Sequence, residues 1–225
     1  MGPTERLRAL LNADPPVFAL DEAALLIAAH EHPDLDVAAH LALLDDLADT
    51  IPEATFEALV ATLFGPGGFT GNTLDYYDPE NSLLDSVLCR RLGVPILLAV
   101  VAMEVGRRRG IPVLGIGMPG HFLIRSASDR DLFADPFSGP ALLDRDDCRE
   151  IFDTLGRSKA RWNESYLSPT NRRDIVVRIL NNLKAIHQRH NDYLRLGRVM
   201  KMRSVVPGLG DNERQEFRRL MAPMN

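Results

Sequence analysis

The stretch PILLAVVAMEVGRRRGIPVLGIGMPGHFLIR, residues 95–125, changes from helical to strand-like sequence at a single glycine. Pro95 suits the first position of a helix, and the residues from Ile96 to Met103 are apolar almost all round. A helix of this kind belongs in the interior of a fold. After Gly110, residues 111–118, 121–125 and 131–137 have the β-branched and aromatic content that is typical of strands. The stretch therefore predicts a buried helix followed by strands, which is an α+β fold.

The sequence on either side of this centre is mostly helical. Residues 1–64 have helical apolar spacing and end at the loop GPGGFTGN. Residues 170–206 predict a helical hairpin joined at 190–192, and 212–221 predict a last short helix. We therefore divide the chain into a helical N-terminal lobe (1–64), a core (65–145), a linker (146–169) and a C-terminal helical segment (170–225).

Composition excludes some classes of protein. No run of eighteen apolar residues exists among the 225, so no membrane span is predicted, and the first residues contain no apolar secretion signal. The two cysteines fit a reducing compartment, which predicts a cytoplasmic protein. Charge is uneven, with twelve acidic and two basic residues in 1–60 against five acidic and twelve basic in 170–225. The basic segment could bind nucleic acid, but its spread at helical intervals favours packing near the acidic half.

His121 and Asp135 form a candidate functional pair. If 121–125 and 131–135 are the arms of a hairpin around Ser128, His121 faces Asp135 across the ladder. Opposite residues have Cβ atoms about 4.5–5.5 Å apart, so the imidazole can contact the carboxylate. This pair could be the base and orienting acid of a catalytic triad, or a cross-strand polar pair on a half-exposed sheet.

Five motifs resemble the SirB-one family of transglutaminase-like bacterial proteins, and the resemblance covers about residues 18–206. They are GN with DYYDPENS (71–82), RRLGVPILL (90–98), EVGRRRG (104–110), PGHFLIR (119–125) and DPFSG (135–139). The resemblance implies a papain/transglutaminase-like core of a central helix plus an antiparallel sheet. It also implies a helical N-terminal lobe and a tetratricopeptide-like C-terminal segment.

The resemblance implies that the nucleophile is missing. In enzymes with this core the nucleophilic cysteine opens the central helix about fifteen residues before the glycine of GIP, where the helix N-terminus stabilises a thiolate. Pro95 stands at that position. His121 and Asp135 are then a vestigial dyad. Cys89, six residues earlier, is the alternative nucleophile, whereas the acidic neighbours of Cys148 should raise the pKa of its thiol.

The segment after the glycine-rich loop predicts a binding surface. Tyr76, Tyr77, Asp78 and Asn81, with Asn72 before them, form either a hydrogen-bonded turn or a wall of the cleft beside His121. The resemblance supports the second interpretation. We predict no cofactor and no metal, because the spacing of His30, His32 and His40 matches no standard metal motif.

The sequence thus favours a non-catalytic regulatory or interaction protein, with a protein or peptide partner, on a degenerate cysteine-hydrolase scaffold. One alternative is an acyl-transfer enzyme or amide hydrolase that uses His121 and Asp135 with Cys89 or water as the nucleophile. Another is a nucleic-acid or ribosome-associated factor that binds through its basic C-terminal helices. The sequence names neither the partner nor the oligomeric state.

Overall fold

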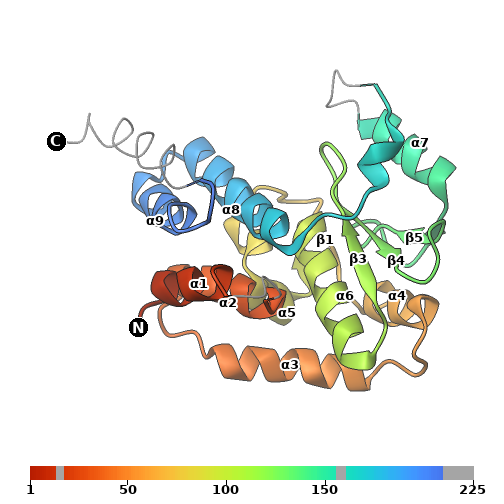
Figure 1. Cartoon of the computed structure of the whole chain (residues 1–225), viewed down its shortest axis with the longest axis horizontal. Coiled ribbons are helices and arrows are strands. Elements are labelled where there is room, and N and C mark those ends of the chain that lie inside the picture. Colours follow the sequence, from red (N-terminus) through yellow and green to blue (C-terminus); the bar gives the residue numbers. More distant parts are fainter. Residues whose placement is uncertain (14–17, 156–160, 210–225) are drawn as a thin grey trace.

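A computed structural model describes residues 1–13, 18–155 and 161–209 (Figure 1). The described residues up to position 64 form the helices α1 (Pro3–Leu11), α2 (Leu20–Glu31), α3 (Val37–Asp49) and α4 (Phe56–Phe64). The strands β1 (Thr70–Gly71) and β2 (Leu92–Gly93) form a short parallel pair. Between them in the sequence lie the 3-10 helix η1 (Pro79–Ser82) and the helix α5 (Leu84–Arg90). The predicted α+β class is confirmed.

The central helix is α6 (Pro95–Arg109), which begins and ends where the sequence predicts. Proline fits its first turn because that position needs no N–H donor. Gly110 ends the helix at φ +76°, a left-handed conformation that glycine adopts without a steric penalty. Every residue of α6 from Pro95 to Gly106 is buried, as expected for a helix that is apolar all round.

The sheet after α6 is antiparallel, in the order β3-β4-β5-β6. Its strands are β3 (Val113–Ile116), β4 (Leu123–Ser126), β5 (Phe133–Ala134) and β6 (Leu142–Leu143). Arg125 lies opposite Phe133, so the hairpin is centred on Asp129, and the predicted centre at Ser128 with His121 directly opposite Asp135 is wrong. The hydroxyl of Ser126 accepts hydrogen bonds from the N–H groups of Ser128 and Asp129, which sets this turn. The observed register of β4 against β5 differs from the predicted one by two residues. Because side chains alternate between the faces of a strand, each side chain still lies on its predicted face.

Both faces of the sheet are covered, so the sheet is not half-exposed. Phe122, Ile124 and Ala134 belong to the main core with α6. Leu123 and Phe133 belong to a second cluster beneath α7 (Arg145–Leu155), together with Cys148 and Phe152 of that helix. Segment 146–169, predicted as a linker, therefore contains most of α7 and the 3-10 helix η2 (Glu164–Leu167), and it builds the second wall of the sheet (Figure 1).

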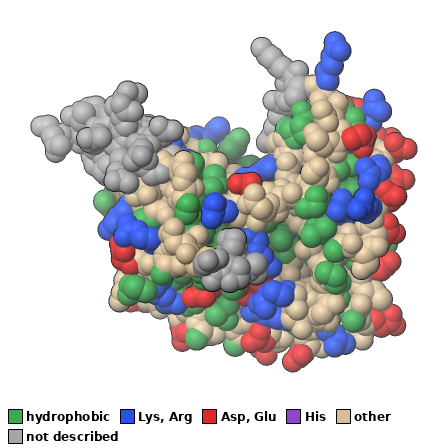
Figure 2. Space-filling model, in the orientation of Figure 1, with side chains coloured by type: hydrophobic (Ala, Val, Ile, Leu, Met, Phe, Trp, Pro, Cys, Tyr) green, Lys and Arg blue, Asp and Glu red, His purple; other side chains and the backbone are tan. Residues whose placement is uncertain are grey.

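The C-terminal segment forms the predicted hairpin, α8 (Arg172–Arg189) and α9 (Tyr193–Arg203). The apolar face of α8 joins the same core as α2 and α6. Arg172 pairs with the buried Glu104 of α6 at 2.8 Å, and Arg198 lies 3.6 Å from Glu31 of α2. Arg195 and Arg198 of α9 both lie near Glu31 of α2, so part of the basic segment packs on the acidic half as predicted, and acidic and basic side chains intermingle over the face in Figure 2.

The short helix predicted at 212–221 lies outside the described residues. Within the ranges that the structure describes, none of the helices has the length and apolar character needed to cross a bilayer.

Candidate functional site

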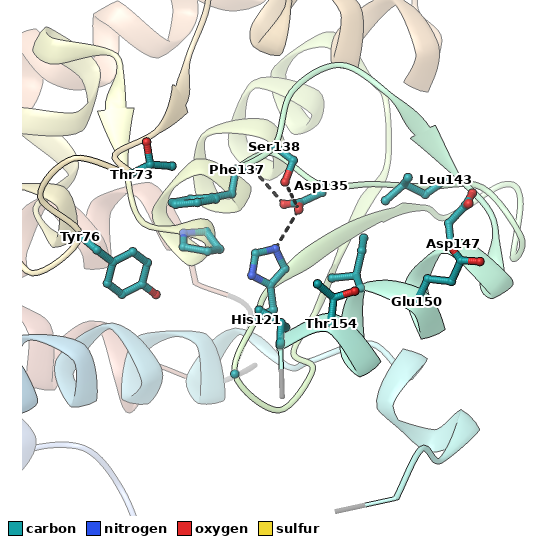
Figure 3. A pocket seen from close by; sticks show the side chains of 14 residues that line it. Thr73, Tyr76, His121, Asp135, Phe137, Ser138, Leu143, Asp147, Glu150 and Thr154 are labelled. Atoms are coloured by element: carbon teal, nitrogen blue, oxygen red, sulfur yellow. Dashed lines mark hydrogen bonds and ion pairs between the residues drawn. The ribbon is translucent and has the colours of Figure 1, made fainter. Parts of the chain in front are cut away.

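The structure brings His121 and Asp135 together. His121 directly follows a turn in which Gly120 has φ +81°, and Asp135 directly follows β5. The Nε2 atom of His121 lies 2.9 Å from Oδ2 of Asp135 (Figure 3). Both residues are buried, with 8% and 4% of their surface exposed. The ring N–H does not point straight at the oxygen, so the two groups are in close polar contact without an aligned hydrogen bond.

Asp135 is held as a carboxylate. Its Oδ2 accepts a hydrogen bond from the Ser138 hydroxyl at 2.6 Å, and its Oδ1 accepts one from the Phe137 N–H at 3.0 Å. Burial raises the pKa of Asp135, but the contact with His121 and these two donors outweigh burial and leave that pKa below its ordinary value. The ionised carboxylate therefore selects the imidazole tautomer with the proton on Nε2, which leaves Nδ1 as an acceptor.

A side chain of α8 holds the loop that carries His121 in place by hydrogen bonds. The guanidinium of Arg178 donates to the backbone oxygens of Met118 and His121 at 2.8 and 2.6 Å, and it lies 5.3 Å from the centre of the Phe122 ring. Burial lowers the pKa of Arg178. The hydroxyl of Thr170 also accepts from the Gly117 N–H at 2.9 Å. The C-terminal segment thus positions the imidazole, although it lies far away in sequence.

A pocket of about 620 Å³ opens beside the pair (Figure 3). The described residues that line it are Thr73, Tyr76, Pro95, Gly120, His121, Asp135, Phe137, Ser138, Leu143, Asp147, Glu150, Ile151, Thr154 and Leu155. Phe137 presents its ring edge-on to both His121 and Tyr76, with centroid distances of 6.1 and 5.9 Å. Pro95 is also one of the lining residues. The first residue of α6, where the resemblance places a nucleophile, therefore forms part of the pocket wall.

Neither cysteine lines the pocket. Cys89 is exposed on α5, and its Sγ lies 4.0 Å from Nε2 of a different histidine, His40. Cys148 is buried beneath α7, where burial and then the nearby carboxylates of Asp147, Asp144 and Asp135 raise the pKa of its thiol to about 12. The predicted effect of the acidic neighbours on Cys148 is present. The structure does not bring Cys89 to the dyad.

Of the predicted binding residues, Tyr76 alone lines this pocket. Tyr77 is 40% exposed, and its ring lies beneath the guanidinium of Arg189 at 4.3 Å. Asp78 caps η1 and pairs with Arg90 of α5 at 2.7 Å. Neither side chain faces His121 in the described pocket.

Asn72 and Asn81 hold the loop in shape instead of facing the pocket. The Nδ2 of Asn72 donates to Oδ1 of Asn81 at 3.0 Å, and the Nδ2 of Asn81 donates to the backbone oxygen of Asp75 at 2.7 Å. The backbone oxygen of Asn81 accepts from the Val94 N–H, which fixes the start of α6. The hydrogen-bonded turn considered from sequence is therefore present, and it supports the pocket wall at Tyr76.

The wall contributed by α7 is not predicted from sequence. Asp147, Glu150, Ile151, Thr154 and Leu155 all line the pocket. Their spacing of three, four, seven and eight residues places them on one face of a helix, and this spacing is the signal that could have identified them. The segment is instead predicted as a linker because its sequence begins with acidic residues. That prediction overlooks the face of α7 that lines the pocket.

Comparison with known proteins identifies the scaffold. Residues 28–181, which run from α2 into α8 and include Pro95, His121 and Asp135, match the family described as the transglutaminase-like superfamily. The chain belongs to the transglutaminase-like superfamily. This transglutaminase-like chain is 39% identical to a UPF0162 protein of Xylella fastidiosa (strain 9a5c) over 202 residues, which is 84% of this chain and 72% of that protein.

Two further relatives differ in extent. A UPF0162 protein of Pseudomonas aeruginosa is 35% identical over 195 residues, or 83% of this transglutaminase-like chain and 71% of that protein. The F-box only protein 21 of Homo sapiens is 35% identical over 69 residues, which is 31% of this chain and 11% of that protein. No solved structure matches the chain.

Proposed function

We propose that this transglutaminase-like protein is a non-catalytic binding protein whose pocket holds a segment of a partner protein. One observation carries the proposal. Pro95 forms the pocket wall at the helix start, where a catalytic cysteine of this scaffold would face the histidine. Proline has no nucleophilic atom, and neither Cys89 nor Cys148 lines the pocket. The geometry of the dyad is retained without an attacking group from the protein.

The pocket has the properties of a recognition site. Its volume of about 620 Å³ lies in the range of sites that enclose small ligands or side chains. Leu74 follows the lining residue Thr73 in sequence and is 99% exposed, so an apolar side chain close to the pocket in sequence is free to contact a partner. The finer resemblance to the SirB-one family and the tetratricopeptide-like interpretation of α8 and α9 also favour a protein partner, by analogy of fold.

Thiol reactivity tests the non-catalytic part of this proposal. Iodoacetamide labelling from pH 5 to 9, with peptide mass spectrometry to separate the two cysteines, is compared between the wild type and His121→Ala. We expect labelling of both thiols to be indifferent to the substitution. Fast labelling of Cys89 below pH 7 that collapses in His121→Ala would establish a thiolate paired with His121 and overturn the proposal.

The retained dyad supports a second candidate, amide hydrolysis by water. His121 would take the proton of a water whose oxygen adds to the amide carbonyl, and it would then return that proton to the leaving amine. Asp135, ionised and 2.9 Å away, would orient the ring. Turnover of a fluorogenic peptide mixture that survives Cys89→Ser and is lost in His121→Ala would favour hydrolysis over the binding function.

A further inference from the structure

The lining of the pocket has a one-sided charge. Asp135, Asp147 and Glu150 contribute carboxylates to it, whereas no lysine or arginine occurs among its described lining residues. Arg145, at the start of α7, is engaged elsewhere, because it pairs with Asp131 and lies 3.2 Å from Glu164. The carboxylate of Glu150 makes no ion pair within the described part of the chain and stands on an exposed turn of α7.

The floor of the pocket adds an acceptor to this charge. His121 is buried to more than nine-tenths, and its ring points into the pocket beside Asp135 (Figure 3). With its proton on Nε2 toward Asp135, the ring offers Nδ1 as a hydrogen-bond acceptor, and no donor to it is found among the described residues. An acceptor that faces the pocket beside several carboxylates suits a group that only donates.

We propose that the pocket binds a lysine or arginine side chain of a basic peptide segment, with an apolar residue of that segment against Leu74. Ammonium and guanidinium groups are donors without acceptor atoms, so they satisfy Nδ1 and the carboxylates together. The apolar walls at Tyr76, Phe137 and Ile151 accept the aliphatic stem of such a side chain. This inference rests on the proposed binding function and specifies its ligand.

A peptide library tests the ligand class and the binding function separately. Immobilised dodecapeptides in which each position is Leu, Ser, Lys or Glu are screened with the purified full chain, and hits are measured by fluorescence anisotropy. We expect bound peptides to be enriched in lysine near a leucine, and their affinity to fall as salt rises. Binding with no preference for lysine over glutamate overturns the ligand class but leaves the binding function standing. Absence of binding by any peptide overturns both.

A charge reversal on α7 provides the matched comparison. Glu150→Lys places a cation in the pocket wall, and we expect it to weaken a lysine peptide by about tenfold, as for loss of a close charge pair. Asp153→Lys makes the same change on the same helix at an exposed residue outside the pocket lining, and we expect it to leave affinity unchanged. Equal weakening in both variants would mean a diffuse charge effect and would overturn the assignment of the pocket.

Discussion

Replacing Pro95 by cysteine should restore a reactive thiol to this scaffold. The residue occupies the first turn of a fifteen-residue helix and shares a pocket with His121. A cysteine there would receive the positive end of the helix dipole and the imidazole together, a combination that lowers a thiol pKa from about 8.5 to within roughly 3.5–7.5. The substitution should be tolerated, because an N–H at the first helical position needs no helical acceptor.

The size of the effect follows from that range. A thiol with a pKa of about 6 is half ionised at pH 6, against roughly 0.3% for a pKa of about 8.5, which is a gain of about 150-fold in thiolate. A less basic thiolate is also less nucleophilic, by about tenfold for this difference in pKa. We therefore expect the thiol of Pro95→Cys to be alkylated about tenfold faster than an ordinary exposed cysteine at pH 6.

The assay is iodoacetamide labelling in a Cys89→Ser background, read by peptide mass spectrometry from pH 5 to 9. Pro3→Cys is the matched control, because Pro3 also opens a helix but does not line this pocket. Cys148, whose thiol has a pKa of about 12, should remain unlabelled and report that the protein is folded. If Pro95→Cys were labelled no faster than the Pro3→Cys control, or at a rate unchanged by His121→Ala, a nucleophile position facing the imidazole would be refuted.

Three further outcomes are expected. Glu104→Gln should lower the free energy of unfolding by about 3–5 kcal/mol in urea titrations, because the fully buried Glu104 pairs with Arg107 and Arg172; Glu53→Gln, at an exposed site, should not. Burial lowers the pKa of His187 in the folded protein below its value of about 6.5 in the unfolded chain. At a pH between these two pKa values, the unfolded chain binds more protons than the folded protein. The free energy of unfolding should therefore fall as the pH drops through this window. His187→Asn should flatten that slope, and an unchanged slope would contradict the reasoning. Arg178→Leu should speed hydrogen exchange at the His121 amide several-fold while exchange in α3 stays as it was, because leucine removes both hydrogen bonds that Nη2 of Arg178 donates to the Met118 and His121 carbonyls.

The centre of the fold is legible in the sequence because its signals are local and strong. The apolar run from Ile96 and the proline and glycine at either end specify α6 without reference to the rest of the chain. The dyad is also accessible from sequence, since strand periodicity places His121 and Asp135 on one face. The register is not, because the turn is set by the Ser126 hydroxyl, which accepts from two backbone N–H groups.

The walls of the pocket depend on long-range packing, and the sequence predicts them only in part. The many charged residues of α7 make its sequence look solvent-exposed, although the helix packs Cys148 and Phe152 onto the sheet. A local sequence pattern also does not show which surface such a helix will cover. Asn72 and Asn81 have the polar character of ligand-binding residues, but they bond to each other and to the loop backbone. Distinguishing these roles needs the three-dimensional partners of each amide.

The contact from Arg178 to the loop at residues 118–121 has a consequence for how the site is made. The two hydrogen bonds join positions 60 and 57 residues apart, so the loop closes only after α8 has been synthesised and has docked. A nascent chain that has just emerged through residue 145 carries both members of the dyad and lacks the clamp that orients one of them. Assembly of the pocket is therefore a late step in folding on the ribosome, and a chain interrupted before α8 is expected to leave its histidine loop untethered.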